Sequence, residues 1–410
     1  MDAFFVAVEV RHDPSLAGKP VIVGGSGDRG VVASCSYEAR AYGIHSAMPS
    51  TRARRLCPQA IFVHGHYDSY SEYSARIHEI FHAFTPVVEG IALDEAFLDV
   101  SGARRLFGTG PEIAWAIRRR LAEELGLSAS VGVATSKLIA KLASEAAKPT
   151  ASLKGPQPGL GVKLVPPGEE LAFLHPLPVR ALWGVGPATG ERLRRFGVVT
   201  VGDLADVPVD ALVGALGSAA GRHLHALSWA RDERPVVAES RTKSVGHEET
   251  YAHDVDERDH LHREVVRMAD AVGSRLRKAG LTGRTVTLKV RYHDFATITR
   301  SHTVATSIDT GPDIARVAAG LLDAVELGAG VRLLGVSLSN LIEGQEAQLS
   351  FDDLAGGAPP GGVHATRAVD AVRERFGEAS VGPAALVDGG GLRVKRRGEQ
   401  QWGPGGDDGG

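Results

Sequence analysis

The chain has 410 residues, enough for about two to four domains, and its composition is that of an ordinary globular protein apart from 50 glycines. Its two cysteines, Cys35 and Cys57, exclude a disulfide framework and a cysteine-based zinc site. The net charge of −3 excludes a uniformly basic nucleic-acid binder, although it leaves local basic patches open. No apolar run is long enough to span a membrane and no secretion signal opens the chain, so we expect a cytoplasmic protein without a membrane partner.

The chain opens on an apolar run, residues 1–9, which we interpret as a buried strand. Two further strands, 18–25 and 30–34, are bounded by turn residues, and the composition of 37–40 suits the start of a helix. Residues 67–85 carry aromatic and aliphatic side chains at helical spacing.

Adjacent carboxylates, Asp94 and Glu95, stand inside an apolar stretch, residues 91–100, that alternates as a strand does. Neighbouring side chains of a strand point in opposite directions, so the two carboxylates cannot both be core residues. They repel each other unless a cation lies between them, and hard divalent ions such as Mg²⁺ take oxygen ligands of this kind. The alternative is a solvated strand edge. A second acidic pair, Asp232-Glu233, has no such apolar frame.

A helix, a strand and a second helix follow the acidic stretch. Residues 111–126 are amphipathic with helical spacing, 128–134 form a buried strand, and Ser136 can cap a helix over 137–147. Residues 149–168 are rich in Gly and Pro and are predicted to be a linker. This order favours an α+β layer with helices on one face of a sheet.

From residue 176 the chain is predicted to be helical with short turns, and residues 181–193 have the form of a helix-hairpin-helix. Gly184 and Gly186 permit a tight hairpin, and the backbone N–H groups at the start of the next helix could hold a DNA phosphate. The alternative is a plain helical hairpin. Residues 231–243 form a polar tether.

Residues 244–342 are predicted to form another α+β unit. Its helices lie near 256–279 and 311–326, and its strands near 284–293, 296–305 and 331–341. One strand face carries Thr residues together with Lys289 and Arg291, whereas the other face is apolar. Such a polar face could bind a DNA backbone without reading bases, and the alternative is an ordinary solvated sheet face.

Seven stretches in this order resemble motifs of the Y-family (translesion) DNA polymerases, most closely those of the bacterial DNA polymerase IV (DinB) type. They are residues 1–5, 36–40, 93–99, 130–133, 137–149, 183–187 and 243–246. The resemblance covers roughly residues 1–343 and implies an α+β multidomain fold, the right-hand polymerase architecture. The implied divisions are a palm (1–10 and 66–150), fingers (11–65), a helix-hairpin-helix thumb (151–230), a linker (231–243), a little finger (244–343) and a flexible tail (344–410).

The resemblance also implies a function and assigns residues to it. The implied enzyme is a monomer that copies damaged templates, transferring nucleotides from dNTPs to a primer on primer–template DNA with two Mg²⁺ ions. Asp94 matches the ligand of both ions, and Glu95 matches the carboxylate on the ion that activates the primer 3′-hydroxyl. Tyr37, Arg40 and Lys148 match the residues that hold the triphosphate of the incoming nucleotide.

Phe5 matches the bulky residue that excludes a ribose 2′-hydroxyl, although its apolar run also permits a plain core role. One feature departs from the family pattern: the first strand of the family ends in a metal-bridging Asp two positions before Asp2. Asp2 matches the next Asp of the family, which is not the principal ligand. Two divalent ions ~4 Å apart repel by about 17 kcal/mol at an effective dielectric of about 20, so a bridging carboxylate matters greatly.

We therefore expect the true start of the protein to lie upstream. The alternative is a catalytically impaired DNA-binding homologue whose thumb and little finger still bind DNA. A two-metal nuclease is a third interpretation, but Tyr37, Arg40, Lys148 and Phe5 suit a nucleoside triphosphate better.

The residues after 343 depart from the family pattern as well. Gln348, Leu349 and Phe351 resemble the peptide with which the family binds the replication sliding clamp, but the peptide is one apolar residue short. A single amphipathic helix is predicted near 364–376, and the glycine-rich end is predicted to be disordered.

Overall fold

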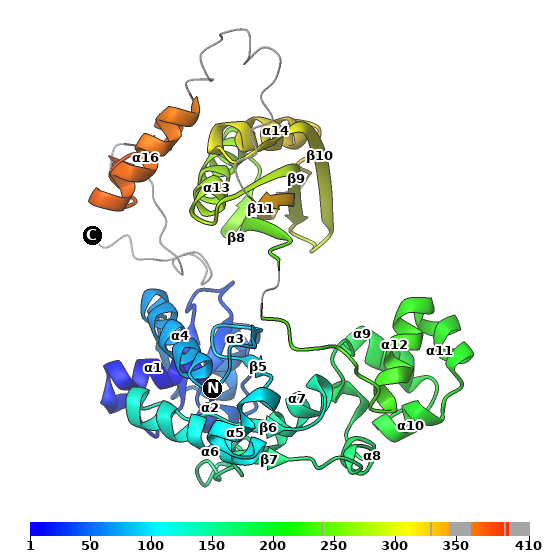
Figure 1. Cartoon of the computed structure of the whole chain (residues 1–410). Helices are drawn as coiled ribbons and strands as arrows, with labels where there is room; N and C mark the ends of the chain where they lie inside the picture. The colour runs from blue at the N-terminus through cyan, green and yellow to red at the C-terminus, as the bar shows by residue number, and fades with distance from the viewer. Residues whose placement is uncertain (239–240, 329, 344–361, 389–390, 393–410) are drawn as a thin grey trace. The chain divides into compact units, whose positions relative to one another are not determined.

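The chain folds into two units, each with its own core (Figure 1). The computed structural model describes residues 1–238, 241–328, 330–343, 362–388 and 391–392. The first unit comprises 1–23, 32–48 and the described part of 53–240; the second comprises 24–31, 49–52 and the described part of 241–410. Among the described residues, no helix is both long and apolar enough to cross a membrane.

The first unit begins with a helix, not with the predicted strand. In chain order its first elements are α1 (Phe4–His12), β1 (Val21–Gly24), β2 (Val32–Cys35), α2 (Tyr37–Arg40), α3 (Ser50–Leu56) and β3 (Ile61–Val63). Phe4 and Val8, one turn apart, are both buried, and Val6 is buried as well. Because apolar residues cover more than one side of α1, the run does not show the spacing of a helix with a single apolar face. The strands form a sheet in the order β2-β1-β3, in which β1 and β3 are parallel.

The middle of the first unit carries two short two-stranded sheets among helices. Its elements are α4 (Tyr67–His82), β4 (Val88–Gly90), β5 (Ala96–Leu98), α5 (Arg104–Phe107), α6 (Gly110–Arg120), a π-helical turn (Leu121–Leu125), β6 (Val131–Val133), α7 (Lys137–Ala146) and β7 (Val162–Leu164). The predicted linker 149–168 therefore contains a strand, β7, which pairs parallel with β6. Three residues between glycines and prolines give too short a periodic signal to reveal it.

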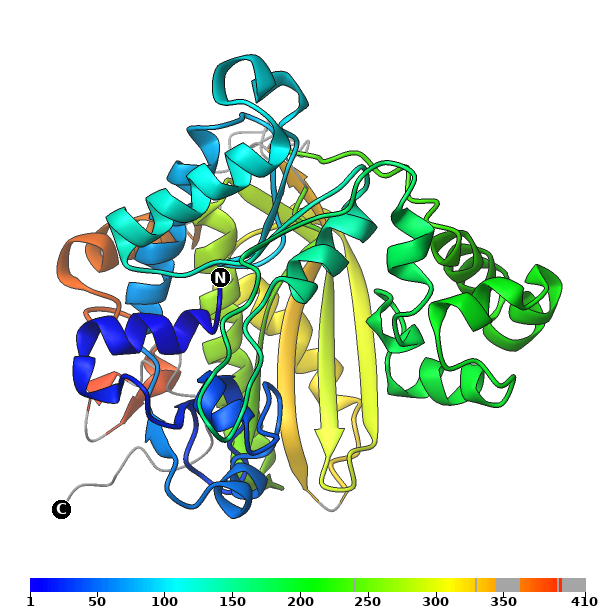
Figure 2. The ribbon, with the colours of Figure 1, turned by 90° about the horizontal axis from the view of Figure 1, so that it is seen from below.

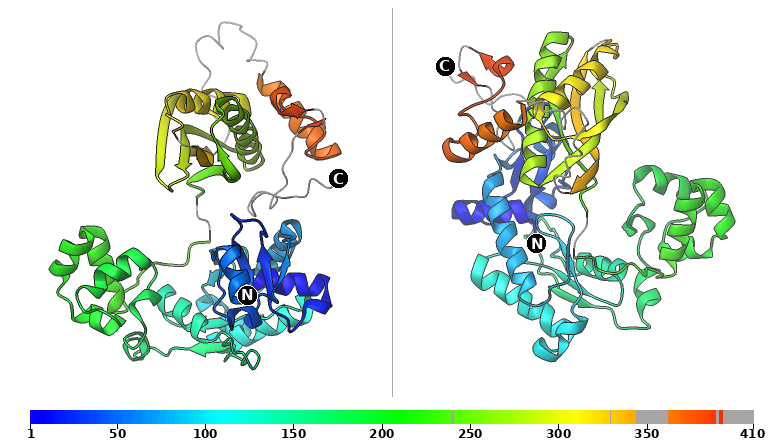
Figure 3. Two further views of the ribbon diagram at one scale, coloured as in Figure 1. Left: turned by 180° about the vertical axis from the view of Figure 1, so that it is seen from behind. Right: turned by 45° about the horizontal axis from the view of Figure 1, so that its top comes forward.

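Short helices, coloured green in Figure 3, end the first unit and share one core. They are α8 (Glu170–Leu174), a 3₁₀ turn (Val179–Ala181), α9 (Pro187–Arg194), α10 (Val201–Asp206), α11 (Val209–Leu216) and α12 (Ser218–Ser228). Leu193, Leu204 and Leu212 of this core are fully buried, and Leu138 and Ile139 of α7 belong to the same cluster. The prediction of a helical region with short turns after residue 176 is confirmed.

The second unit is built on an antiparallel sheet (Figure 2). Its elements are β8 (Ser244–Val255), α13 (Arg258–Lys278), β9 (Leu281–Tyr292), β10 (Thr297–Ile308), α14 (Gly311–Asp323) and β11 (Val331–Glu343), and the strand order is β10-β9-β11-β8. Val286, Leu288 and Val290 are buried with residues of both helices, so the helices cover one sheet face. The predicted helices and three of the strands are confirmed, but sequence analysis missed β8.

After residue 361 the chain forms the predicted helix, α16 (Gly362–Phe376), followed by the small strands β12 (Val387–Asp388) and β13 (Gly391–Leu392). Ion pairs fix α16 to α13: Arg277 Nε lies 2.6 Å from an oxygen of Asp370, and Arg373 lies 2.9 Å from Asp270. Because Arg373 is buried, this helix is an integral part of the second unit, and the prediction of a flexible tail over 344–410 is wrong for α16. The remaining residues predicted to be disordered lie outside the described ranges.

Candidate active site

The two predicted catalytic carboxylates lie at the tip of a β-hairpin. Strands β4 and β5 pair antiparallel, and the N–H groups of Ile91 and Ala92 both donate to the carbonyl oxygen of Glu95, at 2.8 and 3.2 Å. The chain therefore turns back between Ile91 and Glu95, so the prediction of one continuous strand over 91–100 is wrong. Asp94 and Glu95 precede β5 directly, and both side chains are half-buried.

Positive groups contact both carboxylates. The Nζ atom of Lys141 lies 3.1 Å from each oxygen of Glu95, and the amino group of Met1 lies 3.2 Å from an oxygen of Asp94. Burial acts to lower the pKa of Lys141, but hydrogen bonds and the negative charges of Glu95 and Glu145 prevail and raise it. Lys141 is therefore a persistent cation beside the carboxylates.

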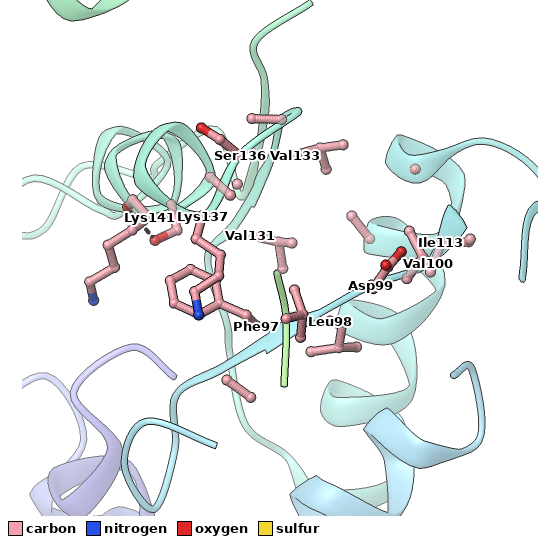
Figure 4. Close-up of a pocket in the computed structure, with 18 of the residues that line it drawn as sticks. Phe97, Leu98, Asp99, Val100, Ile113, Val131, Val133, Ser136, Lys137 and Lys141 are labelled. Atoms are coloured by element: carbon pink, nitrogen blue, oxygen red, sulfur yellow. Dashed lines mark hydrogen bonds between the residues drawn. The ribbon is translucent and has the colours of Figure 1, made fainter. Parts of the chain in front are cut away.

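Helix α7 supplies Lys141 and a second lysine, Lys137, because its two faces differ. Ser136 caps it by accepting a hydrogen bond from the N–H of Ile139, at 3.4 Å. One face is buried, whereas Lys137 and Lys141, one turn apart, project from the other toward the hairpin (Figure 4). A Cβ atom at Gly132 of β6 would lie 1.9 Å from the carbonyl oxygen of Ala140, so only glycine allows this close packing of strand on helix.

A cavity of about 880 Å³ lies beside the hairpin and α7. Figure 4 shows Lys137 beside the ring of Phe97, and the Nζ atom is 5.2 Å from the ring centroid. Both carboxylates, Lys141 and Lys148 also line the cavity. The cavity therefore combines apolar lining with charged side chains, as in binding sites for polar ligands.

Lys148, one of the residues predicted to bind a nucleotide, connects to the same cluster through Glu145. Lys148 Nζ lies 2.7 Å and Lys141 Nζ 3.3 Å from an oxygen of Glu145. Burial acts to raise the pKa of Glu145, but the two lysines outweigh it and lower the pKa. On α2, the guanidinium of Arg40 stacks 4.6 Å from the ring centroid of Tyr37.

The hydroxyl group of Tyr37 is buried and has no hydrogen-bond partner among the described residues. Burial raises the pKa of Tyr37 to about 12; the negative charges of Asp2 and Glu145 add to this, and Arg40 opposes it. A buried hydroxyl without a partner is costly, and a phosphate oxygen would satisfy it. Tyr37 is thus poised to donate a hydrogen bond to an anionic ligand.

Asp2 and Phe5 occupy different surroundings. The buried carboxylate of Asp2 accepts hydrogen bonds from the hydroxyls of Ser128 and Ser130, at 2.6 and 2.8 Å. Phe5, on α1, is half-buried and stacks on Tyr70, with ring centroids 4.2 Å apart at an angle of 11°. Its predicted role against the sugar stays a prediction, because these contacts fit a packing role as well.

Asp232 is a site residue that sequence analysis missed. Its side chain is 2% exposed, accepts a hydrogen bond from the N–H of Leu138 at 2.9 Å, and pairs with Arg234 at 2.6 Å. Glu89 of β4 joins the same segment to α7. Its carboxylate lies 2.6 Å from the Nζ atom of Lys137 and accepts a hydrogen bond from the N–H of Val237 at 2.9 Å. The first half of the tether is therefore held on the hairpin and α7, whereas sequence analysis predicted a polar tether and none of these contacts.

The residues predicted to bind DNA lie on two separate elements. Gly184 has φ of +96°, which only glycine adopts easily, and Gly186 precedes α9. Lys289 and Arg291 lie on the face of β9 opposite its buried Val and Leu residues, as predicted. Gln348, Leu349 and Phe351, predicted to bind a clamp, lie outside the described residues.

Three family models match the chain. The impB/mucB/samB family matches residues 1–145, its C-terminal domain matches 242–351, and the helix-hairpin-helix motif of the same family matches 167–198.

Two curated relatives and one solved structure are similar to most of the chain. A DNA polymerase IV of Streptomyces coelicolor is 48% identical over 87% of this chain and 72% of its own length. A DNA polymerase IV of Desulfatibacillum aliphaticivorans is 42% identical over 94% of this chain and 95% of its own. The structure of a Y-family DNA polymerase chimera of Dbh and Dpo4 matches 83% of this chain and 97% of its own with a TM-score of 0.73 and 25% identity.

Proposed function

The chain belongs to the impB/mucB/samB family, the Y-family DNA polymerases, and is a DNA-directed DNA polymerase; we propose that it performs two-metal nucleotidyl transfer past damaged template bases, with the hairpin carboxylates and α7 as its centre. The α+β right-hand polymerase fold agrees with the similar solved structures.

One observation carries the proposed mechanism: a continuous charged network joins the hairpin to the residues assigned to the triphosphate. Glu95 pairs with Lys141, and Lys141 and Lys148 share Glu145. Glu145 also acts electrostatically on Tyr37. Carboxylates for cations and lysines for phosphates therefore lie within one cluster, as the transfer of a phosphoryl group requires.

The donor set at the hairpin tip fits hard divalent cations. Asp94 and Glu95 supply only oxygen ligands, both are half-buried, and both already contact positive groups. These two residues would hold the two Mg²⁺ ions. When bound, such ions stabilise the attacking and leaving oxygens of an in-line displacement at a phosphate.

The residues of this chain would bind and orient the nucleotide. Lys148 and Arg40 would hold the triphosphate through charge-assisted hydrogen bonds, which are about twice as strong as neutral ones. Tyr37 would donate its unpartnered hydroxyl to a phosphate oxygen. Phe5 would exclude a ribose 2′-hydroxyl.

Primer–template DNA would be bound by the glycines before α9 and by the polar face of β9. In this assignment residues 1–10 and 66–150 are the palm, 11–65 the fingers, 151–230 the thumb, 231–243 the linker and 244–343 the little finger, and the residues after 343 are the tail. Backbone N–H groups at Gly184 and Gly186 would contact phosphates, as would Lys289 and Arg291.

We also propose that the enzyme is a monomer and that Gln348, Leu349 and Phe351 bind the sliding clamp.

A second candidate is a catalytically impaired DNA-binding homologue. It is favoured by the surroundings of Asp2, whose carboxylate is engaged by the hydroxyls of Ser128 and Ser130.

Primer extension distinguishes the two candidates. The 410-residue chain and an N-terminally extended version are tested on undamaged and damaged templates with Mg²⁺ and dNTPs. Extension across the lesion by either version supports the proposal. Tight binding of primer–template by both versions without any extension supports the impaired homologue.

A further inference from the structure

A group of potential metal ligands lies where α1 meets the start of α4, outside the proposed polymerase site. Glu9 and His12 are three residues apart on α1, so they share one side of that helix. His66 stands directly before α4. One potential ligand atom from each residue lies within 4.8 Å of the others.

The two imidazoles are arranged as they would be around one ion. The ring centroids of His12 and His66 are 5.4 Å apart, and the rings are inclined at 73°. The Nδ1 atom of His66 lies 2.8 Å from Oε2 of Glu9. Ligand atoms on a tetrahedral zinc at about 2.0–2.2 Å are ~3.4 Å apart, so small side-chain rotations suffice to bind one ion.

Glu9 is a pre-organised ligand. It is 2% exposed, and its Oε1 accepts hydrogen bonds from the N–H of His66, at 3.1 Å, and from the hydroxyl of Tyr70. These bonds fix the carboxylate and leave Oε2 directed at the imidazole of His66. His12 and His66 are exposed, so an ion could enter from solvent and keep a water as a further ligand.

We propose that Glu9, His12 and His66 form a binding site for a borderline divalent metal of the zinc class. Two imidazole nitrogens and one carboxylate suit Zn²⁺, Co²⁺ or Ni²⁺, whereas Mg²⁺ prefers oxygen ligands alone. The site is therefore chemically distinct from the hairpin carboxylates. A bound ion links α1, which carries Phe5, to the first turn of α4, which carries its stacking partner Tyr70.

A simpler explanation of the Glu9–His66 contact is a hydrogen bond or ion pair without metal. That explanation gives His12 no part, whereas the metal site requires it. His64 offers a matched control, because it is an exposed histidine two residues from His66 and is not a member of the group.

The test is a titration of the metal-free full-length chain with Co²⁺ in excess Mg²⁺, followed by visible absorption and by displacement with Zn²⁺. We expect one Co²⁺ per chain. His12→Ala should weaken binding by about tenfold or more, and His64→Ala should leave it within about twofold. Zn²⁺ should raise the thermal unfolding midpoint of the unmodified chain and of His64→Ala but not of His12→Ala. Binding that His12→Ala leaves unchanged, an equal loss in His64→Ala, or no saturable binding would overturn the proposal.

Discussion

The polar face of β9 makes a quantitative prediction about DNA binding. The face carries hydroxyls that bond across strands, such as Thr287 to Ser301 at 2.9 Å, together with Lys289 and Arg291. The opposite face of the strand is buried, so replacing the two cations leaves the core intact. The double change Lys289→Ala and Arg291→Ala should therefore weaken binding to all duplex sequences alike.

The structure sets the size of this effect. Each phosphate contact releases about 0.9 counterion from B-form DNA, so two contacts contribute up to about 1.8 units to the salt slope. Lys289 lies 2.7 Å from Glu248 and must leave that pair to bind a phosphate, so we expect a slope change between about 0.9 and 1.8. Between about 50 and 200 mM salt, the unmodified chain should then lose roughly 3- to 12-fold more affinity than the double variant.

Fluorescence anisotropy of a labelled primer–template at several salt concentrations measures this slope. Lys278→Ala, which removes an exposed cation from the end of α13, should leave the slope unchanged. Glu248→Gln should steepen it, because the change releases Lys289 from its partner. An unchanged slope in the double variant, or an equal change in Lys278→Ala, would refute the placement of DNA on this sheet face.

Three further predictions concern the first unit. Phe5→Ala should raise ribonucleotide incorporation relative to deoxyribonucleotide; unchanged discrimination would leave Phe5 a packing residue. Tyr37→Phe should raise the KM for dNTPs by about tenfold. That ratio should be constant from about pH 7 to 9.5, because a pKa of about 12 keeps the hydroxyl protonated there, and an unchanged KM would contradict it. Glu89→Gln should speed cleavage after Glu233 by a glutamate-specific protease several-fold by releasing the tether, and an unchanged cleavage rate would contradict its clamping role.

Sequence reasoning predicted elements whose two faces differ. β9 was predicted because Val286, Leu288 and Val290 alternate with polar residues, which a sheet covered on one face requires. β8 was missed because it is an edge strand in which Tyr251 is the buried apolar residue. α1 was mistaken for a strand because its apolar residues are buried on more than one side.

Sequence analysis could single out candidate site residues only where the chemical signal lies in neighbouring positions of the chain. Asp94 and Glu95 could be singled out because the apolar residues around the two adjacent carboxylates are visible in the sequence itself. Asp232 could not be found, because its partner, the N–H of Leu138, is 94 residues away and contacts of that kind leave no periodic signal. The Glu9, His12 and His66 group depends in the same way on the packing of α1 against α4.

The most direct test of the central claim is the rate of primer extension by Glu95→Gln in the version of the chain that is active. The claim is that the hairpin carboxylates hold the catalytic ions, so this isosteric change should abolish extension while leaving the affinity for primer–template within about twofold. Glu79→Gln, which neutralises an exposed carboxylate of α4, should retain the full rate. Extension by Glu95→Gln at a rate close to that of the unmodified chain would contradict the assignment of this hairpin as the catalytic centre.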